Sequence, residues 1–236
     1  MIQFYSKDIE TTFSLGPEES SHCVRVLRKR VGDTIYITDG KGWRFTCRLT
    51  EADPKNARVE INRKEYIGKS RDYSITIAIA PTKNSDRMSW LIEKTVEIGI
   101  DRIIFINTQY TERTRINIER LRRNAISAMN QSLKTFLPEV IDGGKMTSIL
   151  EIKGEKFFGY CDDETPRAVF VKEISAGKDI VVAIGPEGDF SRDEVKDLME
   201  ASFKPVTFGN ERLRTETAAI YAVTAIHVLN DYLDKK

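Results

Sequence analysis

The chain has 236 residues, of which 40% are apolar and 31% charged, a balance typical of a globular protein with a buried core. Its formal net charge of +1 argues neither for nor against nucleic-acid binding. The three cysteines form no C-x-x-C pair and there are only two histidines, which argues against a disulfide framework and a metal centre. No apolar run is long enough to span a bilayer and the N-terminus does not resemble a signal peptide, so we expect a cytoplasmic protein without a membrane partner.

The first 70 residues alternate polar and apolar side chains over short runs, which is typical of half-buried strands. Pro17 and two glutamates favour one helix at 17–30. The run Asp39-Gly40-Lys41-Gly42 indicates a hairpin between two of the strands. The pattern therefore predicts a small barrel of antiparallel strands, with strands at 2–5, 34–38, 43–49 and 57–62.

From about residue 70 onward, apolar strand-like runs alternate with helix-like segments. Such alternation predicts an α/β domain with a mostly parallel sheet and helices on both of its faces. A capping box, Ser191-Arg192-Asp193-Glu194, marks the start of one helix. The expected strands are 74–80, 102–106, 156–161, 179–184 and 206–208, and the expected helices lie around 88–99, at 116–136, from 191 and at 215–233.

Two loops that contain glycine, 184–191 and 208–218, each follow a short apolar strand and precede a helix. Open α/β sheets bind ligands beyond the carboxyl ends of their strands, and glycine lets a backbone approach a ligand closely. The two loops therefore predict one pocket built from main-chain edges. The chain contains no P-loop, no dinucleotide-binding glycine motif and no G-x-S-x-G motif, which argues against the corresponding chemistries.

Residues 112–134 carry more basic than acidic side chains, which suits contact with phosphate groups. A solvated helix face with an excess of arginine is the alternative reading of this segment. The basic residues are Arg113, Arg115, Arg120, Arg122, Arg123 and Lys134, against Glu112 and Glu119.

Six short motifs occur in order along the chain. They are His22 with Val26-Leu27-Arg28, Asp86-Arg87-Met88, Thr111-Glu112-Arg113-Thr114, Gln131-Ser132 followed by Pro138, Ile-Gly-Pro-Glu-Gly at 184–188, and Arg-Leu-Arg-Thr-Glu-Thr-Ala at 212–218. Through these motifs the chain resembles the RsmE family of 16S ribosomal RNA uridine-N3 methyltransferases, within the SPOUT superfamily. The resemblance extends over nearly the whole chain.

The resemblance implies a PUA-like RNA-binding β-barrel at 1–70 and a SPOUT methyltransferase domain at 71–236, whose C-terminal part forms a trefoil knot. It also implies S-adenosylmethionine as methyl donor, a homodimer, and 16S rRNA of the small ribosomal subunit as partner. The implied acceptor is N3 of a uridine in the decoding region.

The same resemblance implies which residues form the site, with no metal among its components. For catalysis it points to Arg214, expected to stabilise negative charge on the uracil, and to Arg113. An ion pair between Arg214 and Glu211 or Glu216 is the alternative for Arg214. Expected cofactor contacts are Cys161, Gly185, Pro186, Glu187, Gly188, Phe208, Gly209, Arg212, Leu213, Thr215, Thr217 and Ala218. Expected RNA contacts are Arg28, Lys83, Arg87, Arg122, Arg123, Gln131 and Lys134.

The chain departs from the family pattern at Asp189, where a second glycine is usual, and at Asn130, where glutamate is frequent. Two other functions remain open from the sequence. One is a non-catalytic RNA-binding or assembly factor, which would bind RNA without taking up the cofactor. The other is a methyltransferase of the same fold that acts on a different RNA or base.

Overall fold

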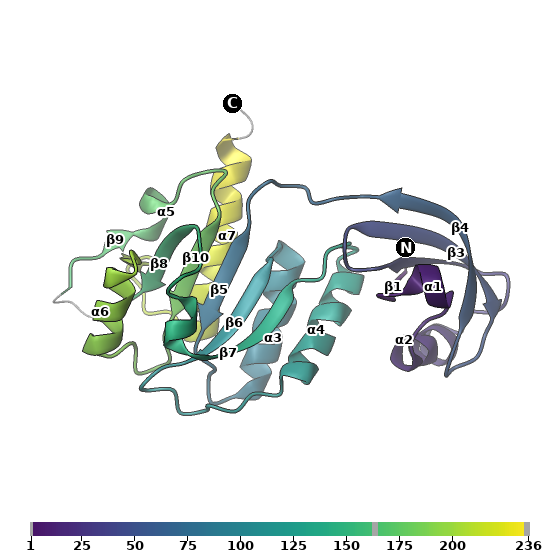
Figure 1. Cartoon of the computed structure of the whole chain (residues 1–236), viewed down its shortest axis with the longest axis horizontal. Helices are drawn as coiled ribbons and strands as arrows, with labels where there is room; N and C mark the ends of the chain where they lie inside the picture. Colours follow the sequence, from purple (N-terminus) through teal and green to yellow (C-terminus); the bar gives the residue numbers. More distant parts are fainter. Residues whose placement is uncertain (1, 162–164, 234–236) are drawn as a thin grey trace. The chain divides into compact units, whose positions relative to one another are not determined.

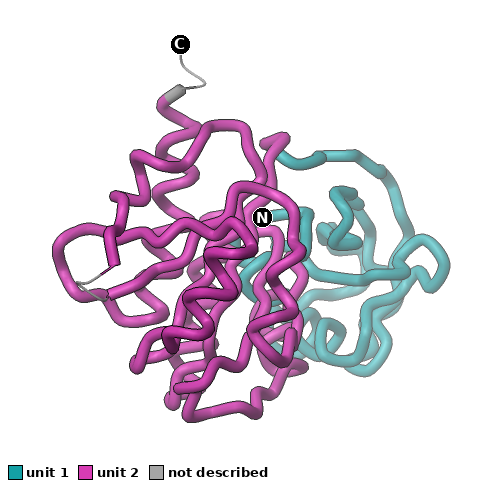
Figure 2. The backbone as a smooth tube through the Cα atoms, turned by 60° about the vertical axis from the view of Figure 1, so that its left-hand side comes forward, with its two compact units in different colours: residues 1–70, 126–137 teal, residues 71–125, 138–236 magenta. Residues whose placement is uncertain are grey.

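The computed structural model describes residues 2–161 and 165–233, which divide into two compact units (Figure 2). The first unit contains the chain up to Ser70 together with Ile126–Leu137. The second contains Arg71–Ala125 and the chain from Pro138 onward. The sequence pattern did not indicate that Ile126–Leu137 belongs with the N-terminal residues.

The first unit is built on a four-stranded sheet in the order β1-β2-β3-β4. The β2–β3 and β3–β4 pairs are antiparallel as predicted, but β1 pairs with β2 in parallel, so the expectation of purely antiparallel strands is wrong for β1. The strands are β1 (Gln3–Tyr5), β2 (Thr34–Thr38), β3 (Trp43–Glu51) and β4 (Arg58–Tyr66).

Short helical segments precede β2 in the first unit: α1 (Ile9–Thr12), α2 (Pro17–Ser21) and a π-helical turn, η1 (His22–Val26). The predicted helix at 17–30 is therefore too long. Arg28 has a left-handed backbone with φ of 53°, a conformation that a helix cannot continue through.

Alternation along β2 and β3 places one side-chain set in a buried core, where Ile35, Ile37, Phe45 and Leu49 are fully buried. Cys47 belongs to the same cluster, and burial raises the pKa of its thiol to about 12. The thiol therefore stays protonated and packs as a small apolar group.

Ile126–Leu137 is held in the first unit mainly through backbone carbonyl groups. The Arg44 side chain donates from Nη2 to the Leu133 carbonyl at 2.7 Å, and Gln3 Nε2 donates to the Lys134 carbonyl at 2.7 Å. The Thr135 carbonyl accepts the Gly42 N–H at 2.9 Å. This segment is thus bonded to β1, to β3 and to the turn that joins β2 to β3.

The second unit contains a seven-stranded sheet in the order β7-β6-β5-β10-β8-β11-β9, with every pairing parallel (Figure 1). All five residues of both β5 and β10 are buried, as expected for central strands covered on both faces. Two of the strands, β7 and β9, were not predicted. The strands are β5 (Ile75–Ile79), β6 (Arg102–Asn107), β7 (Glu139–Lys145), β8 (Glu155–Gly159), β9 (Ala168–Val169), β10 (Ile180–Ile184) and β11 (Lys204–Thr207).

Helices cover both faces of this sheet, as predicted. On one face α7 packs against α3, β5 and β10. On the other, Val195 and Leu198 of α6 and Met146 of η2 join a core with alternate residues of the strands. The predicted capping box is confirmed, because Ser191 and Glu194 exchange both hydrogen bonds. The elements are α3 (Ser85–Ile98), α4 (Ile118–Gln131), η2 (Met146–Ile149), α5 (Phe170–Glu173), α6 (Arg192–Glu200) and α7 (Thr215–Leu233). The residues of α4 from Ile126 on belong to the first unit.

None of the helices in the part of the chain that the structure describes is both long and apolar enough to cross a membrane.

Candidate functional site

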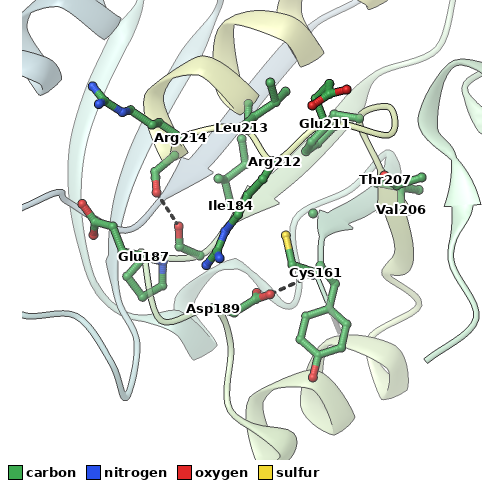
Figure 3. Close-up of a pocket in the computed structure, with 17 residues that line it drawn as sticks. Cys161, Ile184, Glu187, Asp189, Val206, Thr207, Glu211, Arg212, Leu213 and Arg214 are labelled. Carbon is green, nitrogen blue, oxygen red and sulfur yellow. Dashed lines mark hydrogen bonds between the residues drawn. The ribbon is translucent and has the colours of Figure 1, made fainter. Parts of the chain in front are cut away.

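A pocket lies at the carboxyl ends of β10, β8 and β11, which are neighbours in the sheet (Figure 3). Because the three strands are parallel, the loops that follow them meet at one edge. The cavity has a volume of about 320 Å³, within the range of small-molecule sites. Its lining comprises Gly159, Tyr160, Cys161, Ile184, Gly185, Pro186, Glu187, Asp189, Val206, Thr207, Phe208, Glu211, Arg212, Leu213, Arg214, Thr215 and Ala218.

The backbone at Gly185 is packed too closely to carry a side chain freely. A Cβ atom there would lie 3.2 Å from the Asp189 carbonyl carbon and 3.3 Å from Cδ2 of Phe190. The Gly185 carbonyl also accepts a hydrogen bond from Thr215 Oγ1 at 3.3 Å, which joins the start of α7 to this loop. Both loops singled out in the sequence therefore meet directly in the pocket.

Asp189 joins the loop after β10 to the end of β8. Its Oδ2 accepts the Cys161 N–H at 2.8 Å, and its Oδ1 accepts the Phe190 N–H at 2.9 Å. The backbone of Asp189 is left-handed, with φ of 63°, a conformation that glycine adopts freely and aspartate tolerates better than most residues. The departure from glycine at this position thus keeps the glycine-like turn and adds two hydrogen bonds.

The structure gathers most, but not all, of the expected cofactor contacts in this pocket. Those in the lining are Cys161, Gly185, Pro186, Glu187, Phe208, Arg212, Leu213, Thr215 and Ala218. Three lie outside the lining: Gly188, Gly209 and Thr217. Gly188 packs against Tyr110, since a Cβ there would lie 3.0 Å from Cβ of Tyr110, and Gly209 has a positive φ of 116° that serves the turn.

Four lining residues were not anticipated: Gly159, Tyr160, Val206 and Thr207. They belong to β8 and β11 or follow them directly. Gly159 and Tyr160 reach the pocket because β8 lies between β10 and β11 in the sheet, and Val206 and Thr207 end the strand before the loop singled out in the sequence. A three-dimensional neighbour of this kind leaves no local signal in the sequence.

The two arginines of the 208–218 loop have different directions. Figure 3 shows Arg212 extending across the pocket, whereas Arg214 points away from its centre. Glu216 does not pair with Arg214; its Oε1 lies 3.6 Å from Nε of Arg87. The structure therefore does not contain the Arg214–Glu216 ion pair that was one of the alternatives for Arg214.

Lys83, an expected RNA contact, lies in the loop after β5, and Arg113, expected to be catalytic, lies in the loop after β6, both at the edge of the sheet that carries the pocket. Lys83 Nζ is 3.0 Å from Oε2 of Glu112, and Arg113 Nη1 donates to the Lys83 carbonyl at 3.2 Å. On α4, Arg122 pairs with Glu119 at 2.7 Å and Arg123 is exposed.

The remaining expected RNA contacts belong to the first unit. Arg28 and Gln131 are exposed there, and Lys134 is partly buried. Within the described residues, no cluster of three or more histidine, cysteine, aspartate or glutamate side chains has an arrangement that could hold a metal ion.

Two protein-family models match the chain. One describes an RNA methyltransferase domain and matches residues 69–227, and the other describes an RNA methyltransferase PUA domain and matches residues 15–62. The larger match contains every residue of the pocket lining.

Curated relatives are similar over almost their whole length. Ribosomal RNA small subunit methyltransferase E of Rickettsia conorii is 28% identical, with 94% of this chain and 91% of the relative covered. The protein of the same name from Bacillus subtilis is 26% identical, with 98% and 96% covered.

Solved structures are similar over the same extent. A probable rRNA-methyltransferase from Porphyromonas gingivalis is 41% identical with a TM-score of 0.92, and 99% of this chain and 100% of that chain are covered. Ribosomal RNA small subunit methyltransferase E from Neisseria gonorrhoeae, bound to S-adenosyl methionine, is 27% identical with a TM-score of 0.81, and 97% and 98% are covered.

Proposed function

The chain belongs to the RNA methyltransferase family, with a PUA domain before its methyltransferase domain, and we propose that it methylates small-subunit ribosomal RNA from S-adenosylmethionine. The observation that carries this proposal is the pocket at the ends of β10, β8 and β11, which lies wholly inside the matched methyltransferase domain.

The pocket suits a nucleoside-bearing cofactor because it combines main-chain edges with apolar walls. The close packing at Gly185 leaves backbone rather than side chain facing the cavity, and Ile184, Phe208 and Leu213 supply apolar surface. S-adenosylmethionine, when bound, supplies a methyl group carried on a sulfonium centre. We assign its binding to the pocket-lining residues, with Arg212 as the cation that crosses the cavity.

For the acceptor we propose N3 of a uridine in the decoding region of 16S rRNA. Uridine N3 carries a proton and becomes a good nucleophile only once that proton leaves. A neighbouring cation lowers the cost of the resulting negative charge. Arg214, which is exposed beside the pocket, is our choice for this role, and Arg113 is the second.

The finer architecture is part of the same proposal. We expect the first unit to close into a PUA-like barrel, and the chain from 184 to 218 to thread as a trefoil knot. The bond between Thr215 and the Gly185 carbonyl supports this, since it holds the two loops together.

We also expect a cytoplasmic homodimer. Exposed apolar side chains of α7, with Val228 61% and Tyr232 63% exposed, offer a surface for it.

The test is methyl transfer from labelled S-adenosylmethionine to small ribosomal subunits that lack the modification, followed by nucleoside analysis. Label in 3-methyluridine is the expected result. Label in another nucleoside would keep the reaction and replace the acceptor. RNA binding with neither cofactor binding nor label would favour the non-catalytic RNA-binding factor instead.

A further inference from the structure

Glu216, the second residue of α7, is a buried carboxylate with an incomplete set of partners. Its side chain is 5% exposed, and Oε1 lies 3.6 Å from Nε of Arg87. Its other oxygen, Oε2, is buried and accepts no hydrogen bond from any described residue. Burying a charged group without satisfying it costs free energy, so such a residue calls for a reason other than stability.

Arg87 is the cation of this ion pair, and its side chain has unused hydrogen-bond donors. It lies in the first turn of α3, and the packing of α3 against α7 brings it to Glu216. Its side chain is 34% exposed, and its interaction with Glu216 involves Nε. No described residue accepts a hydrogen bond from Nη1 or Nη2 of Arg87. The two terminal nitrogens form a planar fork suited to a bidentate oxyanion.

The charge around Arg87 favours a negative ligand rather than a protein partner. The adjacent Asp86 is already neutralised, because its Oδ1 lies 2.9 Å from Nη2 of Arg120. Lys83 lies just before the helix, in the loop after β5. Lys83 is itself paired with Glu112 at 3.0 Å, so the positive charge that no described carboxylate offsets comes from Arg113, whose guanidinium donates to the Lys83 and Arg115 carbonyls, and from the amino end of α3.

We propose that Glu216 is a positioning residue, which holds the Nε edge of Arg87 so that its Nη1–Nη2 fork meets a phosphate of the substrate RNA. This inference rests on the proposed function and deepens it. At 3.6 Å the Nε–Oε1 contact is an ion pair rather than a hydrogen bond, and it leaves the two terminal nitrogens of Arg87 available for a ligand.

The experiment measures the affinity of the full-length protein for unmodified small subunits across a potassium chloride series. It compares wild type with Arg87→Ala, Arg87→Lys, Glu216→Gln and the double variant. The same proteins are titrated with S-adenosylmethionine and melted. A matched control is the pair Arg102–Glu139, whose Nε–Oε2 distance is 2.7 Å and which lies at the opposite, amino end of the strands. Arg102→Ala and Glu139→Gln should bind subunits as wild type does.

Arg87→Ala should weaken subunit binding about tenfold and reduce the slope of log Kd against log salt by about 0.7–0.9, the value for one lost phosphate contact. Glu216→Gln should weaken binding in the same direction, and the double variant should bind no more weakly than Arg87→Ala. Arg87→Lys should keep the salt slope but recover only part of the affinity. Cofactor affinity should stay unchanged in all the variants. Tm should not fall in Glu216→Gln, whereas Arg87→Ala leaves the buried Glu216 carboxylate without its cation and should lower Tm.

A purely structural Glu216 predicts the opposite: Glu216→Gln would lower Tm and cofactor affinity, and its effect would add to that of Arg87→Ala. That result overturns the inference. If the slope of log Kd against log salt for Arg87→Ala equals that of wild type, the inference is also overturned. This measurement does not depend on whether Glu216→Gln folds. If the wild-type protein still methylates subunits after either of these results, the proposed function holds and only the inference about Glu216 and Arg87 fails. If wild type neither binds nor methylates them, both fail together.

Discussion

Asp189 shows how one side chain can hold a backbone conformation that usually belongs to glycine. Its left-handed φ of 63° has a steric cost, and hydrogen bonds to the Cys161 and Phe190 N–H groups offset it. Asp189→Gly removes both bonds and the steric cost together, whereas Asp189→Ala removes only the bonds. We expect alanine to destabilise the protein by about 1–2 kcal/mol more than glycine.

Thermal unfolding of the two Asp189 variants checks this order, and titration with S-adenosylmethionine reports on the rim of the pocket. Both variants should bind the cofactor several-fold more weakly, because the ends of β8 and β10 are no longer tied together. An alanine variant as stable as the glycine variant would show that the backbone at 189 is not held in this conformation.

The different directions of Arg212 and Arg214 predict different kinetic defects. Arg212→Ala should mainly weaken cofactor binding, since that side chain crosses the pocket. Arg214→Ala should leave cofactor binding intact and lower kcat by about 10²–10³, the usual effect of losing one group that stabilises developing charge. Steady-state kinetics with both substrates separate the two, with Arg102→Ala as a control. Equal loss of cofactor affinity in both variants would contradict the assignment.

At the scale of elements, the α2–α4 contact in the first unit contains a titratable group. Glu19 of α2 accepts a hydrogen bond from Nδ2 of Asn130 at 3.0 Å. Burial is the main cause that raises the pKa of Glu19, from 4.5 to about 7. Since the folded state holds this proton more tightly than the unfolded state, Glu19 favours folding below about pH 4.5, and this contribution is lost as pH rises to about 7.

Glu19→Gln should therefore be more stable than wild type at pH 8, by about 1–3 kcal/mol, and the difference should shrink toward pH 5. Glutamine keeps the shape and an acceptor oxygen for Asn130. Chemical denaturation at several pH values measures the effect, with the exposed Glu60→Gln as control. A difference that does not depend on pH would mean that Glu19 is ionised in the folded protein at all these values.

Elements with a strong local signal were predicted well, and those defined by their neighbours were not. The sequence alone reveals β5 and β10 by their continuous apolar runs, and the start of α6 by the capping box at Ser191. The strand β7 contains Gly143 and Gly144 and has no alternation, and β9 has two residues, so only pairing in the sheet defines them. The predicted helix at 116–136 ends earlier, at Gln131, and Leu133 beyond it has a positive φ of 56°.

At the scale of the whole molecule, the site depends on strand order. The loops after β10 and β11 could be predicted to meet, but these strands are not neighbours: β8 lies between them. Hence Cys161 was expected only from the family resemblance, and Tyr160 was not expected at all. Every residue of the pocket nevertheless comes from the second unit, so its walls need no residue from the first.

The discontinuity of the first unit predicts how the chain responds to truncation. A protein that begins at Arg71 would lack the partners of Ile126–Leu137, including the Gly40 carbonyl that accepts the Leu137 N–H at 3.0 Å. We expect the Leu137 amide to be protected from hydrogen exchange in the full chain and to exchange much faster in the truncated one. The Ile180 amide, bonded to the Ser74 carbonyl at 2.9 Å inside the second unit, is the internal control.

Cofactor binding should survive this truncation far better than RNA binding, because the pocket is confined to the second unit. Exchange measured with and without S-adenosylmethionine tests both statements in one protein. If Leu137 stays protected in the truncated chain, Ile126–Leu137 folds without the N-terminal sheet, and its bonds to Gln3, Arg44 and Gly42 are a consequence of its conformation rather than its cause.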